Sequence, residues 1–343
     1  MKSNVKMVDI ARELGISLST VSRALSDSPL INVETKKKVK ELSCQLGFRA
    51  DLTARSIITK KSNIIGCLVY SLSYNNPLAS ILEMVQEHIK TQNHELFIVS
   101  GSNDLKLQSY LVDKMLSRRV DGMILVPPFI LPNARYEPLD MVMQAGVPCT
   151  VFGYYANCPT NQVCVDLFST GYSIGSHLTG LGHKKIATVY LIDNDPRISG
   201  MKKALSEHDI ELDDNFYIKR KLLKSRDLWA ESDCSDLCRK ILKSGATAIF
   251  VDSDSVAVDI VTNLKKIGIK IPEQIAVATA GDSLPLDILN PALTSYQWPY
   301  EVLAEKLSDV IMDAVQTPSA PTKHIFLPGT LAVRQSTDLR LSK

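Results

Sequence analysis

The sequence has no apolar run that reaches the roughly 18 residues of a membrane-spanning helix. It begins MKSNVKMVDIAREL, without the apolar segment of a secretory signal peptide. Its seven cysteines are odd in number and lack the spacing of a disulfide framework, a pattern typical of a reducing compartment. We therefore expect a cytoplasmic protein that does not associate with a membrane.

Motifs of common enzyme and cofactor sites are also missing. There is no Gly-x-Gly-x-x-Gly after a predicted strand and no Walker loop, and Gly171 and Gly175 instead have the small-residue spacing of a helix. Cys234 and Cys238 are not spaced as in a zinc knuckle, and no histidine lies next to them. No set of Ser, His and Asp has motif support. We therefore expect no catalytic activity, no metal site and no cofactor.

What the sequence does contain is an uneven distribution of charge. Residues 1–62 carry 12 Lys and Arg and 6 Asp and Glu, whereas the remainder carries 27 and 31. Such a basic segment is suited to DNA, because contacts with phosphates supply most of the non-specific affinity. The length of 343 residues and the apolar content of 45% predict two or three globular domains.

The stretch Val8–Leu25, VDIARELGISLSTVSRAL, predicts two short helices joined by a turn. Gly15 ends the first helix, because glycine accepts a positive φ, and Ser17 can cap the second. Val21 and Leu25 then lie on the inner face of the second helix, with polar and basic residues outside. The inner residues of the first helix are Val8, Ile10, Ala11 and Leu14. This pattern is typical of a DNA-binding helix-turn-helix.

A third helix is predicted from Val33 to about Leu46, with Asn32 as its N-cap. Its apolar face consists of Val39, Leu42 and Leu46. A further short helix is predicted over Asp51–Ile58, followed by a basic connector. Because isolated helices below ~12 residues are marginal in water, we expect this hinge helix to form only when something binds it.

From Asn63 onward, short apolar runs alternate with amphipathic segments. The expected strands are Ile64–Val69, Glu95–Val99, Gly122–Val126, Ile186–Leu191, Phe216–Lys219, Ala248–Val251 and Ile275–Ala278. The expected helices are Leu78–Lys90, Leu105–Arg118, Ser169–Leu181, Ser199–Glu207, Asp233–Lys243 and Ser255–Ile267. Apolar strands separated by helices predict parallel sheets covered on both faces, and two such sets predict two doubly wound lobes. A ligand cleft is expected at the carboxyl ends of the strands.

Longer motifs occur in a fixed order along the chain. The head contains VDIARELGIS, STVSRALS and Thr35-Lys36, and ARS follows in the hinge. The body contains GHKKIA at 182–187, Arg197 with Gly200, IPE at 271–273, PALT at 291–294 and VRQST at 333–337. In these motifs the chain resembles the lactose-repressor (LacI/GalR-type) family of transcription regulators. The resemblance implies an all-α helix-turn-helix head and an α/β body of two doubly wound parallel-sheet lobes, like a periplasmic binding protein.

The resemblance also implies a division of the chain into domains. Residues 1–50 form the head, 51–62 the hinge helix and linker, and 63–343 the effector-binding and dimerisation domain. Lobe 1 is expected at about 63–162 and 297–324, and lobe 2 at about 163–296 and 325–340. The family implies a homodimer whose heads bind a two-fold symmetric DNA operator, with a small effector in the cleft.

Contacts with DNA are carried over from the family residue by residue. Leu18, Ser19 and Arg23 are expected to reach base edges in the major groove, and Arg23 can pair bidentately with guanine. Phosphate contacts are expected from Ser17, Thr20, Ser22 and Thr35. The alternative role of these hydroxyls is helix capping, and the two roles can coexist at Ser17.

In the hinge, the resemblance implies that Ile57 wedges between base steps in the minor groove, with Arg55 near the phosphates. Ala50 and Asp51 stand where the family usually has Pro and Asn, and Asp51 adds negative charge there. The alternative for Ile57 is packing against its own dimer mate.

The resemblance implies effector contacts from Tyr74, Asn76, Asp166, Arg197, Trp229, Ser253, Asp254, Asp282 and Trp298. Trp298 replaces a usual Gln, and Gly281 replaces one of two paired aspartates. Arg197 offers fixed donors, and the two tryptophans can cover a flat ring, although both can equally be core residues. We expect a sugar or sugar derivative, with a sugar phosphate as a variant.

Two other functions are compatible with a two-lobed body. A solute-binding protein of a transport system would have no need of the helix-turn-helix. An effector-independent DNA-binding regulator would fit the altered cleft residues. The sequence favours a repressor whose operator affinity is changed by an effector.

Overall fold

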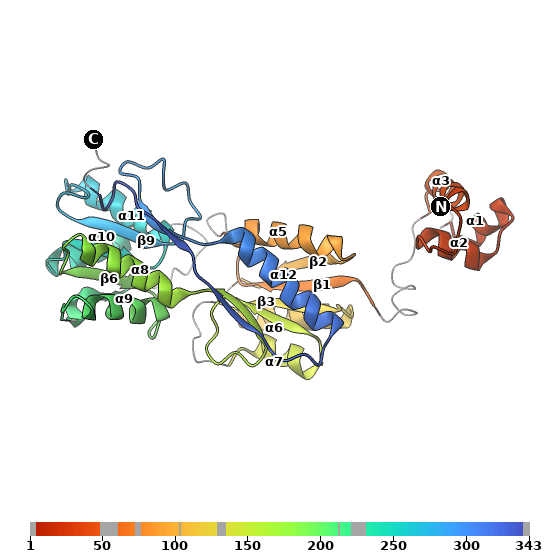
Figure 1. The fold of residues 1–343 in the computed structure, drawn as a ribbon, viewed down its shortest axis with the longest axis horizontal. Helices are drawn as coiled ribbons and strands as arrows, with labels where there is room; N and C mark the ends of the chain where they lie inside the picture. Colours follow the sequence, from red (N-terminus) through yellow and green to blue (C-terminus); the bar gives the residue numbers. More distant parts are fainter. Residues whose placement is uncertain are drawn as a thin grey trace. The chain divides into compact units, whose positions relative to one another are not determined.

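The computed structural model describes residues 5–48, 61–72, 77–102, 104–128, 135–211, 213–220 and 231–338. The chain divides into two units, the head (Met1–Ser62) and the body (Asn63–Lys343), which we describe separately (Figure 1). The described part of the head contains α1 (Met7–Leu14), α2 (Leu18–Leu25) and α3 (Val33–Gln45). Within the ranges above, no helix is long and apolar enough to cross a membrane.

The head is held together by a small core shared by its helices. Ile10, Val21 and Val39, one from each helix, are fully buried. Gly15 ends α1 with φ at +62°, and its N–H donates to Arg12 O at 3.3 Å. The glycine therefore turns the chain directly into α2, as the sequence predicts.

Two apolar side chains expected in this core lie outside it. Val8 is 46% exposed and Leu46 is 38% exposed. Leu46 is the C-cap of α3, beyond the last helical turn, so it does not continue the inner face. Ser43, also on α3, is buried, and its hydroxyl donates to Val39 O at 2.6 Å.

The first sheet of the body is entirely parallel, with strand order β11-β5-β4-β3-β1-β2. Its strands are β1 (Ile64–Val69), β2 (Glu95–Ser100), β3 (Gly122–Val126), β4 (Cys149–Phe152), β5 (Asn161–Val165) and β11 (His324–Leu327). On one face lie α5 (Leu78–Thr91) and α12 (Tyr300–Gln316), and on the other α6 (Leu105–Ser117) and α7 (Glu137–Gln144). This sheet and its helices form lobe 1.

The second sheet has strand order β12-β10-β9-β8-β6-β7. Its strands are β6 (Ile186–Tyr190), β7 (Tyr217–Lys219), β8 (Ala248–Val251), β9 (Ala276–Ala280), β10 (Thr294–Gln297) and β12 (Thr330–Ala332). One face packs against α8 (Leu167–Gly180) and α9 (Pro196–Ser206), the other against α10 (Glu231–Lys243) and α11 (Asp254–Lys266). Two doubly wound lobes are therefore confirmed. The edge strand β12 is antiparallel, contrary to a purely parallel lobe 2.

The chain passes between the two sheets after β5, after β10 and after β11 (Figure 1). The first and third passages are joined by the N–H of Asp166, which donates to Leu327 O at 2.9 Å. The second and third are joined by the N–H of Gly329, which donates to the hydroxyl of Tyr296 at 2.8 Å. Strand β5 ends at Val165 and β11 at Leu327, a few residues beyond the lobe bounds expected at 162 and 324.

Glycines allow α8 and α9 to pack in close contact. A Cβ on Gly171 would lie 1.9 Å from Arg197 O, and one on Gly200 would lie 2.0 Å from Phe168 O. Both distances are far below van der Waals contact. The glycine at position 171 is therefore explained by the close packing of α8 against α9.

We expect Gly171→Ala to destabilise the body by about 1–3 kcal/mol or more, because the two helices must separate. Gly180→Ala, in the same helix, is the matched control, since its Cβ would have no neighbour within 4 Å. There the alanine should be neutral or slightly stabilising. Urea denaturation of both variants checks this, and equal midpoints would contradict it.

Candidate functional site

Helix α2 presents one polar face to solvent. Leu18 is 50% exposed, and Ser19, Ser22 and Arg23 are also exposed, whereas Val21 and Ala24 are buried. Among the described residues, the guanidinium of Arg23 has no hydrogen bond or ion pair. This face therefore leaves the predicted base-reading side chains accessible.

Both predicted capping contacts of the head are present. The Ser17 hydroxyl accepts from Thr20 N at 3.1 Å and lies 2.8 Å from the hydroxyls of Ser19 and Thr20. Asn32 Oδ1 accepts from Thr35 N at 2.7 Å. Each helix thus begins in a group of hydroxyls and N–H groups at the positive end of its dipole, which suits a phosphate.

Asp27, which lies just after the STVSRALS motif, connects α2 to α3. Its carboxylate lies 3.3 Å from Lys36 Nζ and 3.5 Å from Lys40 Nζ, and Lys36 Nζ also donates to its carbonyl at 3.0 Å. The hydrogen bond and charge of Lys36, together with Lys40, lower the pKa of Asp27. Asp27 has a positive φ of 58°, as residues in a tight turn often do. The predicted hinge residues Arg55 and Ile57, and the positions Ala50 and Asp51, lie outside the described residues.

A pocket of about 90 Å³ lies at the carboxyl ends of β1, β3 and β4. We call it the crossing pocket, because two passages of the chain between the lobes contribute to it. Its lining residues are Tyr70, Pro77, Leu78, Ile81, Val126, Pro127, Phe152, Gly153, Tyr154, Cys164, Val165, Leu167 and Trp298. Trp298, a predicted effector residue, is therefore a wall of this pocket. It meets Tyr300 edge-on with ring centroids 6.5 Å apart.

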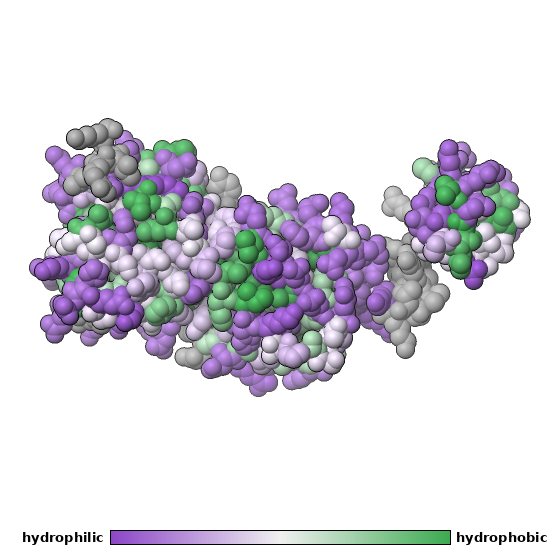
Figure 2. Space-filling model, in the orientation of Figure 1, coloured by the Kyte–Doolittle hydropathy of each residue, from purple (hydrophilic) through white to green (hydrophobic). Residues whose placement is uncertain are grey.

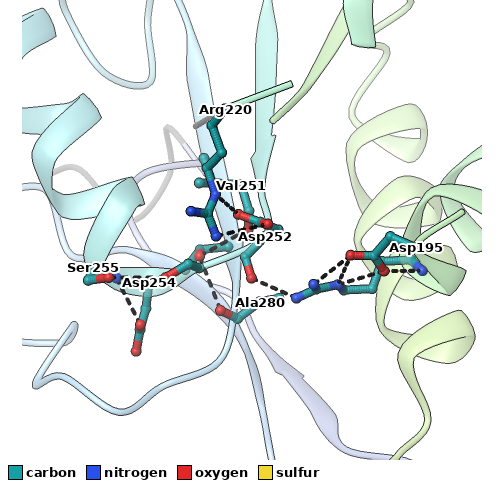
Figure 3. Close-up of polar contacts among 10 residues, drawn as sticks. Asp195, Arg220, Val251, Asp252, Asp254, Ser255 and Ala280 are labelled. Carbon is teal, nitrogen blue, oxygen red and sulfur yellow. Dashed lines mark hydrogen bonds and ion pairs between the residues drawn. The ribbon is translucent and has the colours of Figure 1, made fainter. Parts of the chain in front are cut away.

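Arg197, the predicted gripping arginine, lies at the start of α9 and is only 5% exposed. Its Nε and Nη2 donate to the buried carboxylate of Asp195 at 2.6–3.1 Å, and its Nη1 donates to Asp252 O at 2.6 Å. Figure 3 shows the side chain of Asp252 turned toward Arg220, with Asp195 at the other side of the drawn contacts. Arg197 is thus part of a buried network of hydrogen bonds to protein groups.

A second ion pair extends this network. Arg220, just after β7, donates from Nε and Nη2 to the carboxylate of Asp252 at 2.7 and 3.1 Å (Figure 3). Arg220 comes from a strand end that the sequence does not mark as functional. Only the parallel pairing of β7, β6 and β8 brings it beside Asp252.

The other predicted effector residues of lobe 2 also have protein partners. Asp166 caps α8, accepting from Ser169 N at 2.9 Å. Asp254 accepts from Ser283 N at 2.7 Å, and the Ser253 hydroxyl lies 3.0 Å from that of Ser255. Asp282 accepts from Arg334 Nη2 at 3.2 Å and from Gln297 Nε2. Tyr74, Asn76 and Trp229 lie outside the described residues.

Charged groups of lobe 2 act on two residues that line the crossing pocket from lobe 1. Burial raises the pKa of Cys164 to about 12, and the charges of Arg197, Asp166 and Asp195 also act on it. Burial and the charge of Asp195 raise the pKa of Tyr154. Cys164 and Tyr154 line the crossing pocket from lobe 1, so the charged network of lobe 2 lies close to it. In the part of the chain described here, no three His, Cys, Asp or Glu side chains cluster as metal ligands.

The head and part of the body each match a known protein family. Residues 6–51 match the profile of bacterial regulatory proteins of the lacI family, and residues 176–337 match a periplasmic binding protein-like domain. The chain therefore has a lacI-family DNA-binding domain, followed by a periplasmic binding protein-like domain. Its head therefore has the fold of a DNA-binding domain, and the proteins to which the chain is related are transcription regulators rather than enzymes.

Relatives cover nearly the whole chain. The HTH-type transcriptional repressor PurR of Pectobacterium atrosepticum is 25% identical over 96% of this chain and 95% of its own length. A lac repressor dimer bound to operator and the anti-inducer ONPF is 20% identical, with a TM-score of 0.82 over 98% of this chain and 99% of that one. A LacI family regulator from Enterococcus faecium with bound ribose is 25% identical, with a TM-score of 0.66 over 80% and 98%.

Proposed function

We propose that this regulator is a cytoplasmic repressor that binds a two-fold symmetric operator as a homodimer. We further propose that a small polar effector, a sugar or sugar derivative, binds between the lobes and changes operator affinity. The observation that supports the first part is the accessible polar face of α2, on which Arg23 has no partner among the described residues. The ribose of the Enterococcus faecium protein supports the second.

Exposed apolar side chains in lobe 1 support a homodimer. Strand β2 is an edge of its sheet, and an unpaired edge with apolar residues favours association. Phe97, Ile98, Leu105, Leu107 and Tyr110, on β2 and α6, are 37–56% exposed. The face drawn in Figure 2 is mostly hydrophilic, with a separate apolar region near the first turns of α12. We propose that the β2 and α6 residues lie in the dimer interface.

The test of this function is selection of bound DNA from a random library with the full chain. A metabolite screen against the resulting complex follows. A symmetric preferred sequence and a metabolite that shifts its affinity are expected. If no metabolite shifts the affinity, the chain is an effector-independent regulator. The pairing of Arg197 with Asp195 inside the protein is compatible with that function. If no sequence is preferred, the proposal is wrong.

Arg23→Ala should relax the preference at one base pair, because losing a bidentate contact with guanine costs about 1–3 kcal/mol. Thr35→Ala should instead weaken binding to all sequences alike, as expected for a phosphate contact. Arg12→Ala is the matched control, since that side chain is 77% exposed on α1 and pairs only weakly with Asp9 at 3.7 Å. Binding to a panel of single-base operator variants distinguishes the three. An unchanged preference in Arg23→Ala contradicts the assignment.

A further inference from the structure

A second pocket lies at the other edge of the first sheet, where β4, β5 and β11 begin. We call it the amino-edge pocket. It is enclosed by the last two turns of α12, by residues 317–323 and by the loops that precede β4 and β5. Its volume is about 200 Å³, and all of its lining residues belong to 135–211 and 231–338, which the structure describes without a gap. Because β1 starts at the same edge, directly after Asn63, the pocket lies at the edge of the sheet where the chain enters the body.

The walls of the amino-edge pocket are held in place by hydrogen bonds and prolines. The hydroxyl of Thr160 donates to Cys149 O at 2.9 Å, which joins the two loops. The N–H of Lys323 donates to Asn161 Oδ1 at 2.8 Å, which joins the segment after α12 to the start of β5. Three of the lining residues are prolines, whose φ is fixed. The pocket is thus formed before a ligand binds, so little conformational entropy is lost on binding.

Two charged side chains of opposite sign line this pocket. Lys323 Nζ donates to Asp313 Oδ2 at 2.8 Å, and the two side chains are 47% and 57% exposed. An ion pair as exposed as this contributes little to stability, so its two members can separate and bind other groups at low cost. The pair of Arg197 with Asp195 differs, because both of its side chains are buried. The amino-edge pocket therefore offers a positive and a negative group to a ligand.

The end of α12 adds negative charge to the same pocket. The last carbonyl groups of a helix lack partners within it and form the negative end of its dipole. Thr317 N donates to Asp313 O at 2.7 Å, but the next residue, Pro318, has no N–H to donate. The last turn of α12 has no basic residue either. An ammonium group of a ligand close to Asp313 would therefore be stabilised both by the carboxylate and by the helix end.

Much of the remaining wall is apolar. Val310 and Ala314 lie on one face of α12, and Val147 and Pro148 belong to the loop before β4. A short aliphatic side chain is favourable there, because its apolar surface leaves water. The volume of about 200 Å³ is below the roughly 300–1,000 Å³ of sites for drug-sized ligands. The ligand is therefore a small molecule that carries both charges and an aliphatic group.

We propose that the amino-edge pocket binds a free α-amino acid with an aliphatic side chain. Its ammonium group binds Asp313 and the end of α12, its carboxylate binds Lys323, and its side chain lies against Val147 and Val310. Such a ligand carries both charges at neutral pH, so each member of the ion pair exchanges its partner for a group of the ligand. The site is separate from the proposed effector site, which lies at the carboxyl ends of the strands, and does not depend on it.

The test is calorimetric titration of the full chain with L-valine, L-leucine and L-isoleucine, of which at least one is expected to bind. Three analogues of the tightest-binding amino acid then each lack one group. The amide has no negative charge, the N-acetyl form has no positive charge, and glycine has no side chain. Each is expected to bind about tenfold or more weakly, because a charge-assisted hydrogen bond or a buried aliphatic group is lost.

Variants locate the binding. Asp313→Asn and Lys323→Met nearly keep the size of each side chain and remove its charge, and each should weaken binding about tenfold or more. Both side chains are largely exposed, so neither variant should unfold the chain. Lys306→Met is the matched control, because Lys306 also forms exposed ion pairs on α12 but is not part of the lining. It should bind like the unmodified chain.

Absence of binding by all three amino acids would overturn the proposal. Equal affinity for the amide or the N-acetyl form would overturn it as well, since one of the two charges would then not be used. Unchanged binding by both Asp313→Asn and Lys323→Met would also reject it, because the ligand would then bind elsewhere in the chain. None of these results bears on the proposed function, which is tested by DNA binding.

Discussion

Raising the salt concentration from ~50 to ~200 mM should weaken operator binding by about 10³–10⁵-fold, the effect expected when 6–10 phosphates are contacted. The physical reason is release of counterions from DNA when basic side chains neutralise phosphates. Residues 1–62 carry twice as many Lys and Arg as Asp and Glu, and a dimer presents two such segments. Fluorescence anisotropy of a labelled operator over this range measures the slope of log affinity against log salt.

Thermal unfolding over the same salt range serves as the control, because the head must stay folded for the slope to report on phosphate contacts. The ion pair of Lys40 with Asp27 is exposed on both sides and should contribute little to this stability, since exposed pairs are worth about 0–1 kcal/mol. A slope near zero with a folded head would show that phosphate contacts do not dominate, and the assignment of the basic head as the DNA-binding unit would fail.

The head could be predicted in detail because its determinants are local. Gly15 ends α1, and Ser17 and Asn32 cap the helices that follow, all within a few residues of the groups they bind. The exceptions were Val8 and Leu46, where apolar spacing predicted burial. Three short helices form a core of only a few side chains, so residues near the helix ends remain outside it.

The body could be predicted only at the level of strands and helices. Runs such as Ala248–Val251 are apolar throughout, which identifies a strand buried on both faces. The start of α9 was predicted at Ser199 instead of Pro196. Asp195 is the N-cap of this helix and Pro196 lies in its first turn. Both residues mark a helix start, but neither contributes to the spacing of apolar residues on which the prediction was based.

The contacts within the cleft could not be predicted, because their partners are distant in sequence. Arg197 was assigned to the effector from the family motif, and its bond to Asp252 spans 55 positions. Arg220 and Asp252 meet only through strand pairing. The crossing pocket likewise draws its walls from β1, α5, β3, β4, β5, α8 and the passage at Trp298. No periodicity in the sequence indicates that these segments enclose one apolar space.

The buried pair formed by Asp195 and Arg197 leads to the second large effect. Asp195→Ala should destabilise the body by about 3–5 kcal/mol, because it removes the carboxylate that pairs with the buried Arg197 guanidinium. Both side chains are almost inaccessible, at 1% and 6% exposure. Urea denaturation of the full chain, followed by a probe of the body, measures the change in the free energy of unfolding.

Asp193→Ala is the matched control for this prediction, two residues away in the same loop. Its carboxylate is 66% exposed and pairs with Lys219 at the surface, so its loss should cost less than about 1 kcal/mol. Replacing both members of the buried pair, as Asp195→Leu with Arg197→Met, should recover much of the lost stability, because no uncompensated charge is then buried. If Asp195→Ala is no more destabilising than Asp193→Ala, the guanidinium finds another partner in the cleft, and the network does not depend on Asp195.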